Sequence, residues 1–240
     1  MSAPMTHAGI IAAGLGSRMS ASHPGVPKPL VPVEGKPLVH WVASSLRRAG
    51  VRDITILLNT SGDGVRTYLE KNCADVRWRF LRRDTASSWE SFRLVSRTLA
   101  QEAERFMIST VDAIVQPSEC ARFAREALAP GAEAALALTE FVEDEKPLWA
   151  DADPAGRVQA LGEDVAPARR EAVTCGLYAL TGALPKAMPE ADAHGKLRSY
   201  WIDLVRRGRP VRGVLLRDTV DVDRPEDLAA AAKVISCYGV

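Results

Sequence analysis

A short apolar run that breaks into a glycine-rich turn constrains the fold more than any other feature of this chain. Residues 10–13 read Ile-Ile-Ala-Ala, Gly14 and Gly16 follow directly, and Arg18 and Lys28 add positive charge close behind. Glycine allows turn conformations that other residues avoid, so several backbone N–H groups can point at one anion there. The pattern predicts a β-strand that leads into a phosphate-binding loop.

Two familiar phosphate-binding loops do not fit this stretch. A P-loop requires G-x-x-x-x-G-K-[ST], and no Lys-Ser or Lys-Thr pair follows Gly16 at that spacing. A dinucleotide-binding fingerprint requires a third glycine at the position that Met19 occupies. Both loop types are therefore excluded.

Composition limits the class of partner. The chain has 240 residues and a formal net charge of +1, so no overall field attracts nucleic acid or an anionic membrane. The four cysteines lack the spacing of a zinc site or a disulfide framework, and we expect buried, reduced thiols. With no leader-like or membrane-spanning stretch, the sequence predicts a cytoplasmic protein that binds anions only locally.

Short apolar runs alternate with longer segments of helical period, which is typical of βαβ units and a mostly parallel sheet. The predicted strands are 9–13, 53–58, 76–81, 106–109, 134–139, 158–161, 173–180 and 211–216. The predicted helices are 39–49, 88–105, 119–128, 197–207 and a carboxyl-terminal helix that follows residues 223–226. We expect the long loop over residues 140–170 to recognise a ligand.

The compound motif formed by residues 14–18 and by Pro-Lys-Pro-Leu at 27–30 resembles the signature of the nucleotidyltransferase superfamily. That group includes sugar-1-phosphate and phosphocholine nucleotidyltransferases and, more distantly, molybdenum cofactor guanylyltransferases. The resemblance implies an α/β fold, a Rossmann-like three-layer α/β/α sandwich with a mostly parallel, mixed central sheet, as in GT-A-like nucleotidyltransferases. It also implies one domain over residues 1–240, with a nucleotide-binding half up to about residue 115 and an acceptor-binding half after it.

The activity implied by the resemblance is an EC 2.7.7 reaction, in which an acceptor phosphate attacks the α-phosphorus of an NTP and pyrophosphate leaves. Positioning and charge stabilisation drive such chemistry. By resemblance, Arg18 holds the β- and γ-phosphates and Lys28 neutralises charge at the α-phosphate. The residues expected to bind the nucleotide are Ala12, Ala13, Gly14, Gly16, Ser17, Ser87 and Ser88. Ser87 and Ser88 precede a predicted helix and are equally good candidates for its cap.

Two aspartates are the predicted ligands of a Mg²⁺ cofactor, which prefers one or two carboxylates with phosphate oxygens and water. Asp112 follows the predicted strand 106–109, where the family has a metal-binding aspartate. Asp221 opens a segment that resembles the family's D-[VI]-[DG]-T-P-E-[DR]-L motif, in which Arg224 replaces the usual threonine. We assign Asp223 to the cap of the following helix, because Glu226 stands three residues later, and keep metal binding as the less favoured alternative for this residue.

The acceptor half matches the family less well. Hexose-phosphate members usually carry Glu-Lys-Pro after a Gly-Arg-Val strand, whereas here Glu-Lys-Pro at 145–147 precedes Gly-Arg-Val at 156–158. Lys146 and Gly176 are the predicted acceptor-binding residues, although a solvated Lys146 is an equally good interpretation. Arg169 and Arg170 are weaker candidates. These departures favour a smaller phosphorylated alcohol, such as phosphocholine, or an unusual sugar phosphate.

Two alternatives stay open at this point. One is guanylyl or cytidylyl transfer to the molybdenum cofactor, and the other is a nucleotide-binding regulatory protein without catalysis. The expected partners are an NTP and a phosphorylated small molecule, without nucleic acid or membrane, and homo-oligomers are possible. The sequence specifies neither the base nor the acceptor.

Overall fold

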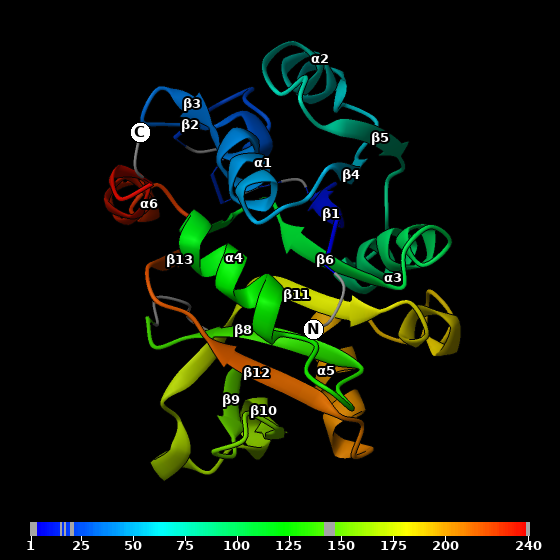
Figure 1. Cartoon of the computed structure of the whole chain (residues 1–240). Helices are drawn as coiled ribbons and strands as arrows, with labels where there is room; N and C mark the ends of the chain where they lie inside the picture. Colours follow the sequence, from blue (N-terminus) through cyan, green and yellow to red (C-terminus); the bar gives the residue numbers. More distant parts are fainter. Residues whose placement is uncertain (1–3, 15, 17, 20–21, 142–146, 239–240) are drawn as a thin grey trace.

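The computed structural model describes residues 4–14, 16, 18–19, 22–141 and 147–238 (Figure 1). These residues form a nine-stranded sheet with helices against both of its faces. Along the sheet the strands follow the order β10 (Val158–Leu161), β9 (Trp149–Ala152), β11 (Ala172–Thr181), β6 (Arg105–Thr110), β1 (His7–Ala12), β4 (Asp53–Leu58) and β5 (Arg77–Arg82). Strand β8 (Ala134–Thr139) also pairs with β11, and β12 (Val211–Leu215) pairs with β8.

The sheet is mixed. Strands β6, β1, β4 and β5 run parallel, which is the pattern expected for the amino-terminal half. Strand β11 runs antiparallel to β6, β8 and β9, while β12 and β8 are parallel. The predicted α/β class with a mixed central sheet is therefore confirmed, and within the nine described strands of this sheet every antiparallel pairing involves β9 or β11.

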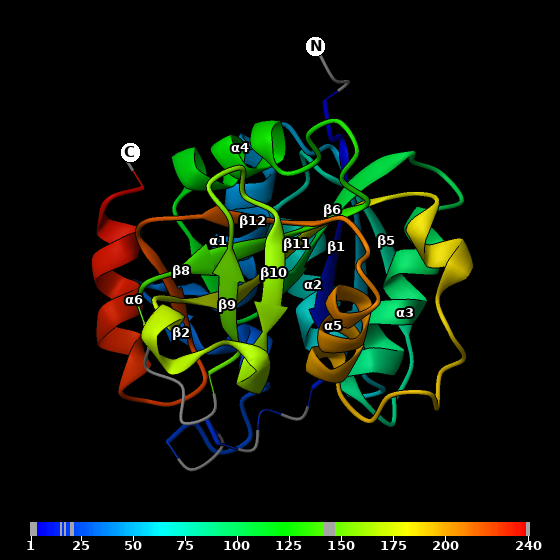
Figure 2. The same ribbon diagram turned by 90° about the horizontal axis from the view of Figure 1, so that it is seen from below.

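The helices separate into two layers. Helices α1 (Leu38–Arg48), α2 (Asp63–Asn72), α4 (Pro117–Glu126) and α6 (Asp227–Ser236) bury their apolar faces in one core, and α3 (Ser88–Leu99) and α5 (Leu197–Arg206) bury theirs in another. Figure 2 shows α3 and α5 together on the right, away from α6 on the left. The side chains of β1 point alternately to the two faces of the sheet and so contribute to both cores. Ala8, Ile10 and Ala12 belong to the first core, and Ile11 packs against the second.

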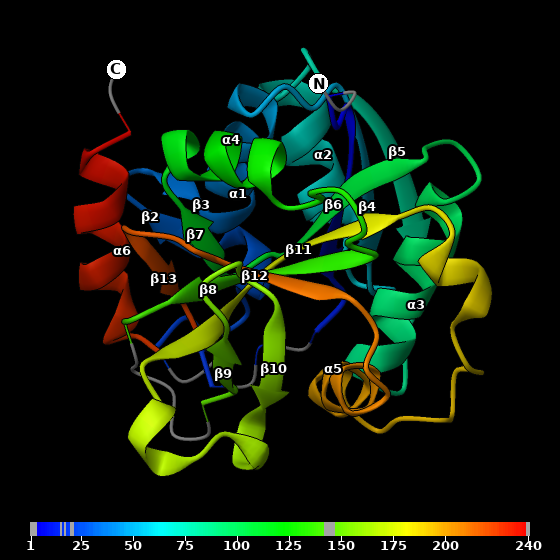
Figure 3. The same cartoon turned by 60° about the horizontal axis from the view of Figure 1, so that its bottom comes forward.

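Smaller elements complete the chain. The pair β2 (Pro32–Val33) and β3 (Lys36–Pro37) precedes α1, and β7 (Ala113–Val115) pairs with β13 (Thr219–Asp221) beside α6 (Figure 3). Short 3-10 helices span Lys28–Leu30, Gly162–Asp164, Pro167–Arg169 and Leu184–Ala187. The β7–β13 pair matters for function, because it joins two segments that are remote in sequence.

Some expected element boundaries are wrong. The helix predicted over 88–105 ends at Leu99, and Arg105 already belongs to β6. Helix α2 was not predicted, because it follows Gly62 and buries only Val65 and Leu69, which leaves a weak apolar stripe. Strand β9 was also missed, since it lies inside the region expected to be loop.

The cysteine and membrane predictions have mixed outcomes. Cys73, Cys120 and Cys175 are buried free thiols, whereas Cys237 is exposed at the end of α6 and contradicts the expectation for that residue. Within the described ranges, no helix combines the length and apolar character needed to cross a membrane.

Candidate active site

The glycine-rich turn after β1 positions the basic residues. Gly16 has φ +61°, and a Cβ added there would lie 2.6 Å from Cβ of Lys28, so the position requires glycine in two ways. Gly14 has no such left-handed φ, and a Cβ there would meet nothing within 4 Å, so the predicted conformational need for glycine is wrong at that residue. Ala12 and Ala13 are buried at the end of β1. Ser17 lies outside the described residues.

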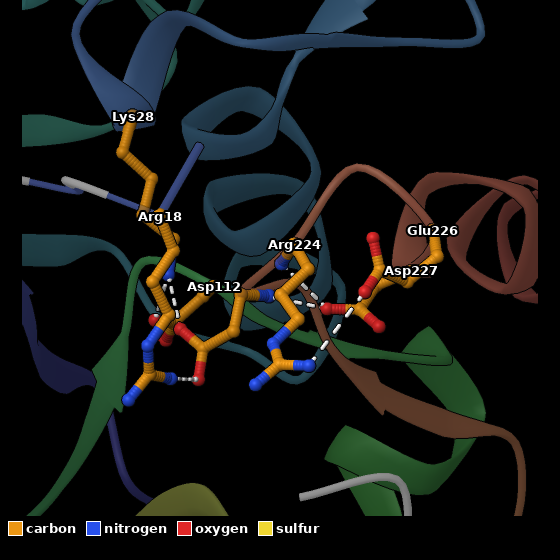
Figure 4. A network of polar contacts seen from close by, with 7 residues as sticks. Arg18, Lys28, Asp112, Arg224, Glu226 and Asp227 are labelled. Carbon is orange, nitrogen blue, oxygen red and sulfur yellow. Dashed lines mark hydrogen bonds and ion pairs between the residues drawn. The ribbon is translucent and has the colours of Figure 1, made fainter. Parts of the chain in front are cut away.

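Lys28 forms the centre of the site. Its Nζ donates hydrogen bonds to Oδ2 of Asp112 and Oδ1 of Asp223, each over 2.6 Å, and its side chain is only 10% exposed. Arg18 Nη1 donates to Oδ2 of Asp223 over 3.1 Å. Figure 4 shows these groups converging from the amino-terminal loop and from later segments of the chain. Two cations and two carboxylates therefore share one small volume.

The β7–β13 pair explains why these remote segments meet. Asp112 lies between β6 and β7, and the N–H of Val222 donates to the carbonyl of Asp112 over 3.0 Å. In the same pairing, Asp221 lies opposite Ala113. The turn that carries Asp112 and the turn that carries Asp223 are thus held together by backbone hydrogen bonds.

The opposite charges of Lys28 and its neighbouring carboxylates determine the protonation states of these groups. Burial by itself lowers the pKa of Lys28, but the adjacent carboxylates of Asp112 and Asp223 outweigh burial and raise it above its ordinary value. Burial works against ionisation of Asp112, yet the Lys28 ammonium beside it holds the pKa of that carboxyl below its ordinary value. Both groups are charged at neutral pH, so the centre is an ion-paired network.

The predicted capping role of Asp223 is wrong. Its carboxylate faces Lys28 and Arg18, and the residue before α6 is Glu226, which makes no side-chain capping bond. Asp227 instead binds the loop before α6, because its Oδ2 accepts the N–H groups of Asp223 and Arg224, each over 2.7 Å. A buried carboxylate in the first turn of α6 thereby fixes the preceding loop.

The oxygen donors suit a hard divalent cation. Asp112 and Asp223 each place an oxygen within bonding distance of one ammonium, so they are close enough to share one cation. Asp221, the other predicted ligand, lines the cavity beside this centre. Within the part of the chain that the structure describes, no three His, Cys, Asp or Glu side chains form a group that could hold a metal by themselves. Magnesium bound by one or two carboxylates, with the remaining ligands from phosphate and water, would agree with this arrangement.

A cavity of about 360 Å³ lies beside the charged centre and extends toward α5. Its lining includes Arg18, Asp112, Gly176, Tyr178, Arg198 and Arg224. Gly176 has φ +69°, and a Cβ there would lie 2.5 Å from Oγ1 of Thr110, so this predicted residue permits close backbone approach beside the cavity. The register of β11 against β8 shifts between Thr174 and Tyr178, where β11 passes along the cavity.

Other predicted residues have structural contacts. Ser87 Oγ accepts the N–H of Glu90 over 3.0 Å and caps α3, as its alternative interpretation required. Ser88 Oγ accepts the N–H of Leu197, which ties α3 to α5 at the edge of the cavity. Neither contact tests nucleotide binding.

Of the predicted acceptor cations, the structure describes Arg169 and Arg170. Lys146 lies outside the described residues. Arg169 pairs with Asp151 over 2.6 Å, Arg170 donates to the carbonyl of Val165, and neither lines the cavity. Sequence reasoning missed Arg198 as a cavity residue, and it treated Arg224 only as a departure from the motif. The signal for Arg224 was its place directly after Asp223.

Comparisons with known proteins agree with this geometry. The family model described as "MobA-like NTP transferase domain" matches residues 8–174. Among curated proteins, a 2-aminoethylphosphonate cytidylyltransferase from Lancefieldella rimae is 43% identical over 56 residues, covering 23% of each chain. A CMP-5'-(3-aminopropyl)phosphonate synthase from Streptomyces rubellomurinus is 29% identical over 131 residues, covering 53% of this chain and 20% of the relative. The matches span about a quarter or less of the curated relatives' length.

Solved structures show the same fold. The inositol-1-phosphate CTP transferase from T. maritima superposes with a TM-score of 0.82 at 18% identity, covering 100% of both chains. A UDP-glucose pyrophosphorylase in complex with UDP-glucose superposes with a TM-score of 0.76 at 16% identity, covering 97% of this chain and 98% of the other. These likenesses confirm the fold that the opening motif implied.

Proposed function

The chain belongs to the family of MobA-like NTP transferase domains, and from this premise we propose that it transfers a nucleoside monophosphate from an NTP to a phosphorylated or phosphonylated small molecule. The family membership confirms the resemblance seen in residues 14–30. The observation that carries the proposed activity is Lys28 held between Asp112 and Asp223, with Arg18 on the same carboxylate, beside a cavity.

The proposed reaction is an in-line displacement. An oxygen of the acceptor's phosphate or phosphonate forms a bond to the α-phosphorus, the bond from that phosphorus to the bridging oxygen breaks, and pyrophosphate leaves with the electron pair. Arg18, whose side chain is 58% exposed, exchanges its contact with Asp223 for the β- and γ-phosphates. Lys28 stabilises negative charge as it develops around the α-phosphorus. The backbone of the turn at residues 12–16 would orient the nucleotide.

Magnesium would be held by Asp112 together with Asp223, and when bound it would neutralise phosphate charge. We propose this pair because both carboxylates already bind one cation, Lys28. Asp221, the partner predicted from the motif, lines the same cavity and stays a predicted ligand. Within one domain, the parallel half of the sheet would bind the nucleotide and the antiparallel half would bind the acceptor.

CTP and a small phosphate or phosphonate are the substrates that we propose first. The curated relatives named above include one cytidylyltransferase and one synthase of a CMP-linked phosphonate, and the T. maritima structure is described as a CTP transferase. The sequence departures around the acceptor loop independently favour a small phosphorylated alcohol over an ordinary hexose phosphate.

The test is pyrophosphate release with magnesium from each of the four ribonucleoside triphosphates. The acceptor panel contains 2-aminoethylphosphonate, 3-aminopropylphosphonate, inositol-1-phosphate, phosphocholine and glucose-1-phosphate. Release that requires one acceptor, and that falls at least about 100-fold in Asp112→Asn, supports the proposal. Asp192→Asn, an exposed residue away from the cavity, is the matched control.

Separate variants decide between the metal ligands. Mn²⁺ binding in the presence of the active nucleotide should weaken in Asp112→Asn and in Asp223→Asn, and Asp221→Asn shows whether a third carboxylate contributes. If no phosphate or phosphonate in the panel supports pyrophosphate release, and nucleotide transfer to molybdopterin occurs, the molybdenum cofactor alternative is supported instead. Nucleotide binding without any pyrophosphate release would support a regulatory protein.

A further inference from the structure

Three arginines among the described residues line the cavity, and each comes from a different segment. Arg18 follows the glycine-rich turn, Arg198 lies in the first turn of α5, and Arg224 lies between β13 and α6. If the proposed function holds, Arg18 serves the nucleotide's phosphates. The acceptor brings its own anionic group into the same site, and that group needs a separate cation.

The backbone holds Arg224 in a defined place. Its N–H donates to Oδ2 of Asp227 over 2.7 Å, and the neighbouring N–H of Asp223 donates to the same oxygen. Arg224 directly follows Asp223, whose carboxylate binds both Lys28 and Arg18. Arg224 is therefore adjacent in sequence to a member of the charged centre, where the phosphate groups of the two substrates would meet.

The side chain of Arg224 is directed toward the cavity. In Figure 4 the side chains of Arg18 and Arg224 extend from their backbones in the same direction, and both line the cavity. Arg224 Nη1 lies 3.7 Å from Oε1 of Glu226, a side chain that is 65% exposed. An exposed pair at this distance stabilises little, so a bidentate anion can compete for the guanidinium.

A second group in the cavity also points to a ligand. Tyr178 is 7% exposed and lines the cavity, yet its hydroxyl makes no hydrogen bond to any residue in the described ranges. Its ring stacks on Trp201 with centroids 5.4 Å apart, and it packs edge-on against Phe92. The hydroxyl is not among the buried polar atoms that lack a partner, so it is open to the cavity, where it can donate a hydrogen bond to a bound ligand.

We propose that Arg224 binds the phosphate or phosphonate group of the acceptor, and that the Tyr178 hydroxyl donates a hydrogen bond to the same molecule. The proposal rests on the function proposed above and assigns its acceptor site. This assignment gives Arg224 a contact of the kind that the sequence predicted for Lys146, which lies outside the described residues. The pocket then binds a compact acceptor whose charged group lies against the β13–α6 turn.

The first experiment is independent of turnover. Inorganic phosphate is titrated calorimetrically into wild-type protein, Arg224→Gln, Arg198→Gln, Arg18→Gln and the control Arg217→Gln, which changes an exposed arginine away from the cavity. We expect Arg224→Gln to weaken phosphate binding about 10- to 100-fold, which is typical of one charged hydrogen-bonded contact. Arg217→Gln should bind like wild type, and Arg224→Lys should recover part of the affinity.

Several results would overturn the assignment. These are equal phosphate binding by wild type and Arg224→Gln, no binding by wild type, or a loss confined to Arg198→Gln or Arg18→Gln. Circular dichroism and thermal melting of each variant separate a local effect from unfolding.

The second experiment uses whichever acceptor supports pyrophosphate release. Arg224→Gln should raise the KM for the acceptor about 10- to 100-fold while the KM for the NTP changes less than about threefold. Tyr178→Phe should raise the acceptor KM about five- to tenfold without loss of stability. A rise in the NTP KM instead would place Arg224 on the nucleotide and refute the proposal. If no acceptor reacts, the function proposed above fails, while the phosphate titration still decides the role of Arg224.

Discussion

Replacing Lys28 by methionine tests the centre of the site, because methionine keeps much of the side-chain length and removes the charge. Lys28 Nζ lies 2.6 Å from an oxygen of Asp112 and 2.6 Å from an oxygen of Asp223. At an effective dielectric constant of 20, each pair attracts by about 6 kcal/mol before desolvation is counted. Most of that attraction is offset by the loss of hydration, so one charged hydrogen bond contributes about 1.5–3 kcal/mol net.

Exposure reduces the contribution of one of the pairs. The side chain of Asp223 is 41% exposed and that of Asp112 is 23% exposed, so solvent screens the first pair more. We expect Lys28→Met to lower the free energy of unfolding by about 3 kcal/mol, because two carboxylates are left facing each other. For a domain of this size that corresponds to a Tm lower by about 6–12 °C.

Magnesium should distinguish Lys28→Met from an ordinary core defect. In the wild-type protein the ammonium lies between the two carboxylates, and in the variant a divalent cation can take that place. Magnesium at ten times its Kd would stabilise the variant by about 1.4 kcal/mol, and the wild-type protein by less. Differential scanning fluorimetry with and without MgCl₂ measures both effects, with the exposed Lys71→Met as the control.

Two outcomes would refute this reasoning. A Tm within about 2 °C of wild type would show that the ion pairs contribute nothing net to stability. An equal response of both proteins to magnesium would show that Lys28 does not occupy the cation position. Turnover should fall about 100-fold or more in either case, so activity alone cannot distinguish the outcomes.

Three further predictions follow from the same structure. The pKa of Asp112 is lowered in the folded protein, so the ionised carboxylate stabilises the fold above the ordinary pKa of 3.8. This stabilisation is lost as the pH falls through the pKa of the folded protein. The Tm difference between wild type and Lys28→Met should therefore shrink in acid melts below about pH 4. Gly176→Ala should lower stability by about 1–3 kcal/mol in chemical denaturation, because its φ of +69° and the 2.5 Å approach to Thr110 exclude a Cβ; an unchanged midpoint would contradict the backbone described here. With Ellman's reagent at pH 8, native protein should label at Cys237 alone, because the other three thiols are buried; rapid labelling of Cys73, whose pKa burial raises to about 11, would contradict the packing around α2.

The segment around Lys28 was predictable because its signals are local. The apolar run at 10–13, the turn at Gly16 and Lys28 lie within about twenty residues of one another. Asp112 was found for a similar reason, since it lies two residues after the end of strand β6. Most of the predicted strands and helices likewise match to within a few residues, although the helix predicted over 88–105 ends at Leu99, and α2 was missed because its apolar stripe is weak.

The rest of the cavity could not be predicted in this way, because it is assembled from segments that only the fold brings together. Gly176 on β11 was predicted, but Tyr178 on the same strand, Arg198 from α5 and the place of Arg224 after β13 were not. No local spacing relates these residues to one another. Lys146, the predicted acceptor lysine, lies outside the described residues and stays a prediction.

The two aspartates around Arg224 show how a correct motif can still give an incorrect role. An acidic residue three positions before a glutamate at the start of a helix fits the capping pattern, so Asp223 was assigned to the helix. In the structure the buried carboxylate of Asp227, which lies inside the helix, replaces Glu226 as the acceptor of the Asp223 N–H and also accepts the N–H of Arg224. That substitution leaves the Asp223 carboxylate for Lys28 and Arg18, and it fixes the direction in which the backbone presents Arg224 to the cavity. Asp227 therefore acts as a positioning residue for Asp223 and Arg224. The main role of the turn before α6 is to position the charged centre, and starting the helix is secondary.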